Sequence, residues 1–299
     1  MKNKIWVLVV ISQAFVINWA HAQERHHHKH KAHKTHASQR FDPASPHVQS
    51  NIALIVDAKS RDVIYDKHAD LVAPIASITK LMTAMVVLDA KLPMDEMVSV
   101  EREDLDLLKG TKSRLRIGMS FTRAEMLHMA LMASENRAAS ALARNYPGGL
   151  SSAIAAMNLK AKQLGMVNTR FFDATGLNSE NVSTARDLVK MVAAARAYPL
   201  IHQYTTSAST SVEGLRGREL RFRNTNPLVK NASWDIGVSK TGFINEAGRC
   251  LVMEATFNDR HVIIVLLDSW GKRTRIGDAN RIKKWIESAN TGFSLMRRS

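Results

Sequence analysis

Short runs of apolar and β-branched residues stand near both ends of the chain. Residues 52–58 (IALIVDA) and 62–67 (DVIYDK) are separated by a few polar residues, and this pattern predicts a hairpin. Residues 249–269 contain two further apolar runs around a polar turn at 258–260, which predicts a second pair of strands. Strands at both ends of the chain predict one antiparallel sheet that is built from the two ends.

The long segment between these strands has the apolar spacing of amphipathic helices. One helix has a clear start signal, because Thr122 is followed three residues later by Glu125, which is the pattern of a capping box. We therefore expect an α+β fold in which helices flank an antiparallel sheet and the middle of the chain is helical. The predicted helices cover residues 77–91, 122–133, 149–165, 184–198 and 275–288.

The first residues have the organisation of an export signal. Lys2 and Lys4 form a short basic start, an apolar stretch follows over 5–17, and residues 20–22 (AHA) fit a small-x-small cleavage pattern. We expect residues 1–22 to be a signal peptide. The apolar stretch is short for a membrane span, which needs roughly 20 residues. No later segment has that length, so we expect no integral membrane span after signal cleavage, and export to the periplasm.

The next segment, 23–47, is rich in histidine and lysine and has too few apolar residues to fold, so we expect it to be disordered. Its six histidines within 26–36 allow two interpretations. Clustered imidazoles can capture a metal ion, or the segment can be a solvated tether that touches anionic polymer. We favour the tether. One folded domain is then expected at 48–290, with a C-terminal tail at 291–299.

The formal net charge of the chain is +15. Residues 24–40 contribute +4, and removing these residues with Lys2 and Lys4 leaves +9 on residues 41–299. A basic exported protein favours anionic surfaces such as cell wall or lipid headgroups, and no nucleic-acid-binding motif is present, so we do not expect nucleic acid as a partner. The one cysteine, Cys250, excludes an internal disulfide; we expect a buried apolar role for it rather than a thiol nucleophile.

Candidate chemistry begins at Ser77 and Lys80, in the stretch ASITKLMTAM at 76–85. Positions three apart share one face of a helix, and a helix N-terminus favours developing negative charge. Serine needs a base to become a nucleophile, and a buried lysine with a lowered pKa can be that base. The pair alone is also compatible with a serine that merely caps a helix.

Two other motifs could likewise be either part of a catalytic site or purely structural. Ser134 and Asn136 follow an apolar helix, and such residues often cap helix ends. Lys240, Thr241 and Gly242 precede the terminal strands, and this pattern also fits an edge strand with a glycine bulge.

In this order, and after an export signal, the three motifs resemble the penicillin-recognising serine enzymes. The chain is similar to the low-molecular-mass penicillin-binding proteins, the serine D-alanyl-D-alanine peptidases, over about 50–290, and most similar to their endopeptidase type, penicillin-binding protein seven. Segments 173–188 (DATGLNSENVSTARDL), 222–229 (FRNTNPLV) and 240–253 (KTGFINEAGRCLVM) share in the resemblance. It implies a β-lactamase/transpeptidase-like fold with an inserted all-helical subdomain, and no cofactor or metal at the site.

The resemblance also implies a role for each motif residue. Ser77 would attack a D-alanyl carbonyl and form an acyl-enzyme, Lys80 would take its proton, and Ser134 would relay a proton to the leaving nitrogen. The backbone N–H groups of Ser77 and Phe243 would form the oxyanion hole. The residues expected to bind substrate are Asn136, Lys240, Thr241, Gly242 and Phe243. Arg186 and Asn224 also match recurring positions, and we expect them to be structural or to support the site.

The implied function is a periplasmic serine peptidase of peptidoglycan that binds β-lactams covalently and cuts the D-alanyl–diaminopimelyl cross-link. A Glu-x-x-Leu-Asn pattern, which would supply a deacylating base, is not found, since Glu180 and Glu219 have other neighbours. Penicillin is therefore expected to acylate Ser77 and stay. Two alternatives remain open: a D-alanyl-D-alanine carboxypeptidase or transpeptidase with the same residues, and a non-catalytic protein that binds cell wall or metal.

Overall fold

The computed structural model describes residues 45–296 of the 299-residue chain. The expected signal peptide at 1–22 and nearly all of the histidine-rich segment expected at 23–47 lie outside the described residues. The predicted limits of these regions therefore stay predictions.

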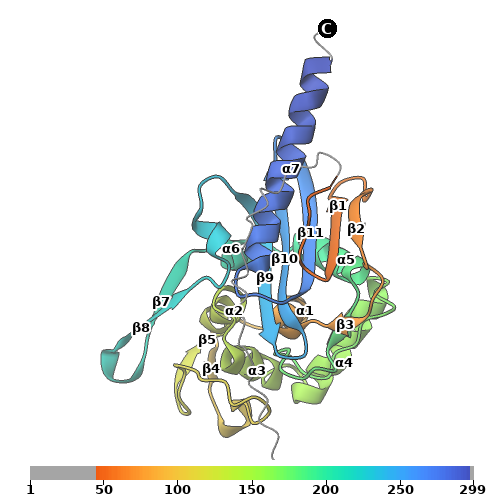
Figure 1. Ribbon diagram of the computed structural model, residues 1–299. Coiled ribbons are helices and arrows are strands. Elements are labelled where there is room, and N and C mark those ends of the chain that lie inside the picture. Colours follow the sequence, from red (N-terminus) through yellow and green to blue (C-terminus); the bar gives the residue numbers. More distant parts are fainter. Residues whose placement is uncertain (1–44, 297–299) are drawn as a thin grey trace, which may run out of the picture. The chain divides into compact units, whose positions relative to one another are not determined.

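A five-stranded antiparallel sheet joins the two ends of the folded unit (Figure 1). Its strand order is β2-β1-β11-β10-β9, so β1 pairs directly with β11. This arrangement confirms the sheet that the sequence predicts from its terminal strands. The strands are β1 (Ile52–Asp57), β2 (Val63–Lys67), β9 (Asp235–Ile244), β10 (Gly248–Phe257) and β11 (Arg260–Ser269).

Helices cover both faces of this sheet, which explains why the central strands β1, β10 and β11 contain long apolar runs. In β1, Leu54 and Val56 point into one hydrophobic core, and Ala53 and Ile55 point into a second core on the opposite face. The C-terminal helix α7 (Thr274–Met296) supplies the second core with apolar side chains such as Ile282. In Figure 1, α7 crosses one face of the sheet, and α1 and α5 lie on the other.

The predicted helices all form, with shifts of a few residues at their ends. The predicted capping box is present, because the Glu125 N–H donates to Thr122 Oγ1 over 3.2 Å and the Thr122 N–H donates to Glu125 Oε2 over 2.8 Å. The helices before α7 are α1 (Thr79–Asp89), α2 (Arg123–Met132), α3 (Asn136–Arg144), α4 (Gly149–Gln163), α5 (Ala185–Ala195) and α6 (Pro199–Thr206). Of these, α3 and α6 were not predicted from the sequence.

The inserted middle of the chain is largely helical but also contains three two-stranded sheets. Most of these strands have only two or three residues, which is too short to leave an alternating pattern in the sequence. The longest pair, β7 and β8, forms a hairpin that projects from the body of the fold (Figure 1). The pairs are β3 (Ala73–Pro74) with β6 (Val182–Ser183), β4 (Met97–Ser99) with β5 (Ser120–Thr122), and β7 (Ser209–Glu213) with β8 (Glu219–Arg223).

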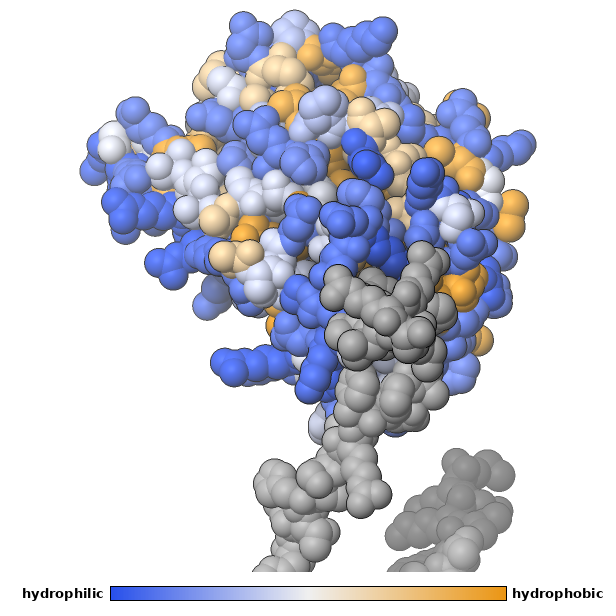
Figure 2. Space-filling model, turned by 90° about the horizontal axis from the view of Figure 1, so that it is seen from above, coloured by the Kyte–Doolittle hydropathy of each residue, from blue (hydrophilic) through white to orange (hydrophobic). Residues whose placement is uncertain are grey.

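The last helix is longer than predicted, since α7 continues to Met296 instead of ending near 288. Part of the expected tail at 291–299 is therefore helical. No helix within residues 45–296 combines the length and apolar character that crossing a membrane requires. The face of the molecule in Figure 2 is mainly hydrophilic, and its hydrophobic residues form small separate groups.

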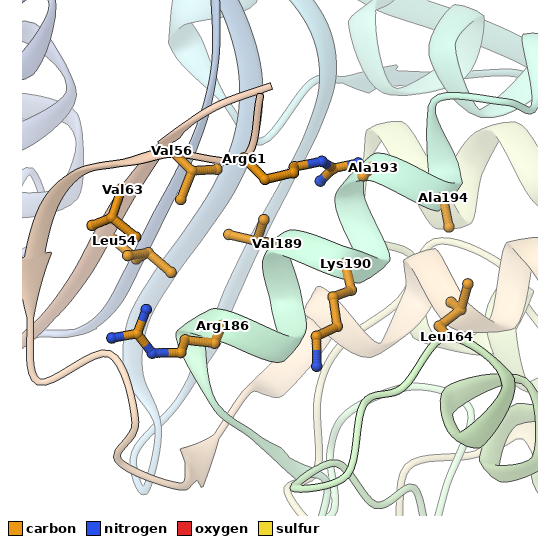
Figure 3. Close-up of a pocket in the computed structure, with 10 residues that line it drawn as sticks. All are labelled: Leu54, Val56, Arg61, Val63, Leu164, Arg186, Val189, Lys190, Ala193 and Ala194. Atoms are coloured by element: carbon orange, nitrogen blue, oxygen red, sulfur yellow. The ribbon is translucent and has the colours of Figure 1, made fainter. Parts of the chain in front are cut away.

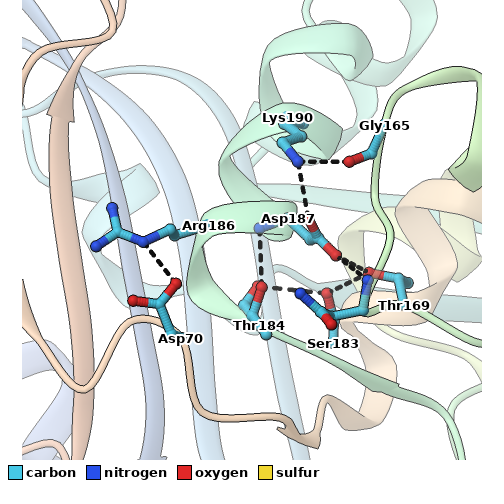
Figure 4. A network of polar contacts seen from close by, with 9 residues as sticks. Asp70, Gly165, Thr169, Ser183, Thr184, Arg186, Asp187 and Lys190 are labelled. Carbon is cyan, nitrogen blue, oxygen red and sulfur yellow. Dashed lines mark hydrogen bonds and ion pairs between the residues drawn. The ribbon is translucent and has the colours of Figure 1, made fainter.

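A groove of about 530 Å³ lies between α5 and strands β1 and β2 (Figure 3). Its floor is apolar, and two of the cations at its edge already have anionic partners (Figure 4). Arg186 binds Asp66 and Asp70, and Lys190 binds Asp187. The pairs of Arg186 tie α5 to β2 and the residues after it, whereas the Lys190–Asp187 pair lies within α5. Arg186 thus has the structural role that we expected.

Candidate active site

The Ser77 hydroxyl lies beside the Lys80 amine, as the spacing of the two residues predicts. Ser77 is in a short 3-10 helix (Ala76–Ile78) just before α1, and Lys80 is in the first turn of α1. Their Oγ and Nζ atoms are 2.9 Å apart. The preceding residue, Ala76, has a left-handed backbone (φ 47°), a conformation that costs roughly 1–3 kcal/mol and tends to occur at functional sites.

The Lys80 amine is held by two further acceptors. It donates to Asn136 Oδ1 over 2.7 Å and to the Thr175 carbonyl over 2.6 Å, and the side chain is only 1% exposed. Burial lowers the pKa of Lys80 to about 8, although the carboxylates of Asp173 and Glu135 oppose this shift. About one tenth of the amine is then neutral at pH 7, so Lys80 can act as a base.

Ser134 and Asn136 lie in the sharp link between α2 and α3. Ser134 has a left-handed backbone (φ 60°), and Asn136 is the first residue of α3. The Ser134 hydroxyl accepts a hydrogen bond of 2.8 Å from Lys240 Nζ. Asn136 connects the Lys80 amine to Thr111 Oγ1, to which its Nδ2 donates over 3.0 Å. The link thus places both side chains against the basic groups of the site.

Strand β9 brings Lys240 and Thr241 to the same place. Lys240 is 1% exposed, and burial lowers its pKa well below the usual range, helped by the charges of Lys80 and Arg275. The Thr241 hydroxyl donates to Thr225 Oγ1 over 2.6 Å. Two buried amines therefore lie within one small site, and the charge of Lys80 disfavours the charged form of Lys240.

Gly242 allows β9 to run directly beside the nucleophile. A Cβ atom there would lie 3.0 Å from the Ile75 carbonyl oxygen and 3.2 Å from the Ser77 nitrogen. Gly242 pairs regularly with Cys250, and the irregularity in this ladder falls further back along β9, so the alternative of a glycine bulge at this position is wrong. Phe243 follows at the rim, 49% exposed and covered by the Arg249 guanidinium at 4.3 Å.

These pieces surround one open cavity of about 250 Å³. Six of the eight predicted site residues line it directly, and the amines of Lys80 and Lys240 lie immediately behind its wall. The structure therefore brings all eight together. The lining residues are Ser77, Thr111, Ser134, Asn136, Leu177, Thr225, Thr241, Gly242, Phe243 and Arg275.

Arg275 is a cavity residue that the sequence analysis missed. It comes from the start of α7 and is 9% exposed, and its Nε and Nη1 atoms have no hydrogen-bond partner among the described residues. Burial lowers its pKa from the usual arginine value. A buried guanidinium with unused donors at the cavity wall is suited to an anionic group. The sequence gives no signal for it, because residues 272–284 contain several other lysines and arginines.

The turn at 173–178 supports Lys80 from behind. The Asp173 carboxylate accepts the backbone N–H groups of Thr175, Gly176 and Asn178 at 2.6–2.9 Å, which fixes the Thr175 carbonyl that binds Lys80. Gly176 has φ +81°, and a Cβ atom there would lie 1.9 Å from the Ala76 carbonyl oxygen. The contact shows that this turn packs directly against the residue before the nucleophile.

Two other residues from the sequence analysis lie outside the site. Asn224 donates from Nδ2 to the carbonyls of Thr205 and Ser207 and so joins α6 to the end of β8. Cys250 is fully buried in β10, and burial raises the pKa of its thiol to about 12. A thiol in this state is not a nucleophile near neutral pH. Within residues 45–296, no group of three or more His, Cys, Asp or Glu side chains could hold a metal ion.

Comparison with known proteins agrees with this geometry. The family profile for D-alanyl-D-alanine carboxypeptidase matches residues 39–271. D-alanyl-D-alanine endopeptidases from Escherichia coli and Pseudomonas aeruginosa are 51% and 49% identical over 246 and 247 residues, covering 82% of this chain and 79% and 80% of theirs. The structure of the Streptomyces K15 DD-transpeptidase superposes with a TM-score of 0.74 at 29% identity, covering 80% of this chain and 97% of that one.

Proposed function

Because the chain belongs to the D-alanyl-D-alanine carboxypeptidase family of serine peptidases, we propose that it hydrolyses D-alanyl peptide bonds of peptidoglycan through an acyl-enzyme on Ser77. The observation that carries this proposal is the 2.9 Å contact between Ser77 Oγ and the buried Lys80 amine at the wall of an open cavity. A serine with an adjacent base of lowered pKa has the two parts that nucleophilic catalysis requires.

In the first half of the reaction, Ser77 Oγ attacks the carbonyl carbon, and its proton moves to the neutral Lys80 amine. The tetrahedral oxyanion then accepts hydrogen bonds from the backbone N–H groups of Ser77 and Phe243, each worth about 3 kcal/mol in such sites. The close approach of β9 to the Ser77 backbone supports this pairing. Collapse of the intermediate expels the amine of the leaving residue, which takes a proton through Ser134.

In the second half, water attacks the acyl carbon and gives its proton to the same bases, which frees Ser77. Asn136 holds the substrate amide and orients Lys80. Lys240, Thr241 and Arg275 make one end of the cavity favourable for a substrate carboxylate. β-Lactams would acylate Ser77 and stay, because the pattern that supplies a deacylating base in β-lactamases is not found in the sequence.

We propose the cross-link between D-alanine and diaminopimelate as the bond that is cut, because relatives about half identical to this chain carry the name endopeptidase. A digest of purified sacculi tests this choice. Loss of dimeric muropeptides would support the endopeptidase, whereas trimming of pentapeptides with the dimers intact would support the second candidate, a carboxypeptidase. That candidate rests on more distant relatives with that name, one of them 34% identical.

We place this activity in the periplasm, on the strength of the export-signal pattern at residues 1–22. Cell fractionation with an antibody against the folded domain tests the location. Recovery in the cytoplasmic fraction with the first 22 residues still attached would contradict it.

A further inference from the structure

A second cleft, separate from the active cavity, is lined mainly by arginines. It has a volume of about 660 Å³ and lies between the loop at 113–119 and the β7–β8 hairpin. None of the residues that line it is acidic. They are Ser113, Arg114, Arg116, Met119, Leu215, Arg216, Arg218 and Leu220.

Three of these arginines have no partner for their charge among the described residues. The guanidinium groups of Arg116, Arg216 and Arg218 are exposed and form no hydrogen bond or ion pair with the described residues. Arg114 has a different role, because it stacks on Phe222 at 4.1 Å and donates to the Arg221 carbonyl. Arg114 thereby joins the loop to the hairpin and holds the two walls of the cleft together.

Both walls of the cleft are joined along the chain to residues that line the active cavity. On one side the loop leads from Ser113 back to Thr111, which lines the cavity and accepts a hydrogen bond from Asn136. On the other side β8 leads to Thr225, which also lines the cavity and accepts from Thr241. The loop is fixed to the link around α3 as well, because Ser113 Oγ donates to Glu135.

The separation between the cleft and the cavity suits a peptide. Leu220 and Thr225 are five residues apart, and the chain is extended as far as Arg223, so the two residues are separated by at most about 17 Å. An extended substrate of four or five residues covers that distance. A short D-alanyl-D-alanine end would fill only the cavity, so the cleft becomes useful when the substrate is longer.

We propose that this arginine cleft binds the carboxylates of the stem peptide that continues from the bond being cut, and so favours cross-linked over short substrates. The proposal rests on the proposed function for its substrate. Each cross-linked diaminopimelyl residue keeps a free carboxylate, and arginine is the side chain best matched to carboxylates. A peptide fits better than a flat lipid surface, because the charges line a cleft whose two walls are joined along the chain to residues of the cavity.

Direct binding tests the proposal without requiring catalysis. The full chain carrying Ser77→Ala is titrated into a fluorescently labelled cross-linked muropeptide dimer, with and without the triple change Arg116→Gln, Arg216→Gln and Arg218→Gln. Exposed ion pairs are individually weak and are screened by salt. We therefore expect the triple variant to raise Kd on the order of tenfold at low ionic strength and to lose most of the salt dependence of binding.

A matched control changes Arg61→Gln and Arg170→Gln, since both side chains are exposed and without partners among the described residues and neither lines the cleft or the cavity. This double variant should bind the dimer as the parent does. The proposal would be overturned if the triple variant bound the dimer with the same Kd as the parent. It would also be overturned if the triple and control variants lost affinity for the dimer equally. Binding to vesicles of anionic phospholipid but not to the dimer would also overturn it.

Penicillin labelling of the chain with Ser77 intact separates this proposal from the proposed function. Penicillin is small enough to need only the cavity, so we expect the triple variant to be acylated at the parent's rate. Failure of the parent to be acylated would count against the Ser77 mechanism, whereas the dimer titration would still report on the cleft. A triple variant that loses acylation and dimer binding together would show a distorted cavity and contradict a separate binding cleft.

Discussion

At the scale of single residues, the environment of the Lys80 amine sets the pH dependence of the reaction. Burial lowers its pKa to about 8, so the amine is mostly protonated below that pH and cannot accept the Ser77 proton. The rate of penicillin acylation should therefore fall tenfold for each pH unit well below 8 and level off above it. Stopped-flow measurement of acylation from pH 6 to 10 checks this, and a rate that is flat across that range would contradict it.

Changing one acceptor of Lys80 should move this profile. Asn136→Asp places a carboxylate where Asn136 Oδ1 now lies, 2.7 Å from Nζ. A nearby negative charge favours the protonated amine and raises its pKa. The midpoint of the acylation profile should move to higher pH, and an unchanged or lower midpoint would show that Lys80 is not the titrating base. Thr111→Val, which removes the other partner of Asn136 and a hydrogen bond to Asp106 but adds no charge, is the control and should leave the midpoint near its original value.

Ser77 and Lys80 should also behave as one unit. Ser77→Ala and Lys80→Ala should each reduce acylation by roughly 10³- to 10⁶-fold, and the double variant should lose little more, because either change already removes the activated nucleophile. Single-turnover labelling with a fluorescent penicillin measures all three. Losses that multiply in the double variant would mean that the two side chains act independently.

At the scale of elements, the turn at 173–178 should control both stability and the geometry of the nucleophile. Gly176→Ala introduces a Cβ atom that overlaps the Ala76 carbonyl, at a position whose φ of +81° also disfavours alanine. We expect a loss of about 2–4 kcal/mol in the free energy of unfolding, together with slower acylation. Urea denaturation and penicillin labelling measure the two effects.

Gly110→Ala is the matched control for this change. Gly110 has a similar backbone (φ +62°), and a Cβ atom there meets nothing within 4 Å. It should cost only about 1 kcal/mol, from the backbone alone. Equal losses at the two positions would mean that the contact between the turn and Ala76 has no importance.

Sequence patterns predict those elements whose periodicity is long and unbroken. Strands β10 and β11 each have ten residues and long apolar runs, and α2 has a capping box; all three form where the sequence predicts them. In contrast, only three residues separate α2 from α3, and Ser134 and Asn136 at this link indicate the end of a helix more readily than the start of a new one. The β7–β8 hairpin has alternate side chains facing solvent on a thin arm, and its sequence resembles a polar loop.

The residues of the candidate site also differ in whether a local sequence pattern reveals them. Ser77 and Lys80 can be paired from sequence because they share one helical turn, whereas Arg275 reaches the cavity from a helix about two hundred residues away. Such a contact depends on tertiary packing, and nothing local distinguishes this arginine from its neighbours. The same limit explains why the arginine cleft, built from two distant loops, has no signature in the sequence.

At the scale of the whole molecule, a buried carboxylate joins the beginning of the folded domain to its last helix. Asp278 in α7 accepts the N–H groups of Gln49 and Ser50, at 2.9 and 2.7 Å, and the Ser50 hydroxyl. Asp278→Ala leaves the backbone N–H groups of Gln49 and Ser50 without this acceptor, whereas the Ser50 hydroxyl keeps its contact with Ser269. We expect a loss of about 3 kcal/mol in the free energy of unfolding, measured by urea denaturation.

The exposed Asp235 at the start of β9 serves as the control for that loss, because its side chain has no partner among the described residues. Asp235→Ala should change the free energy of unfolding by less than about 0.5 kcal/mol. A loss at Asp278 no larger than this would show that the contact between the two ends contributes little to the fold.

The proposed acyl-enzyme mechanism depends most on Ser77 being the nucleophile, and mass spectrometry of the penicillin adduct tests this directly. After reaction and proteolysis, the peptide that contains residues 76–80 should carry the added mass of one intact, ring-opened penicillin on Ser77, and Ser77→Ala should carry none. An unlabelled wild-type protein, or an adduct on any other residue, would contradict the proposed mechanism.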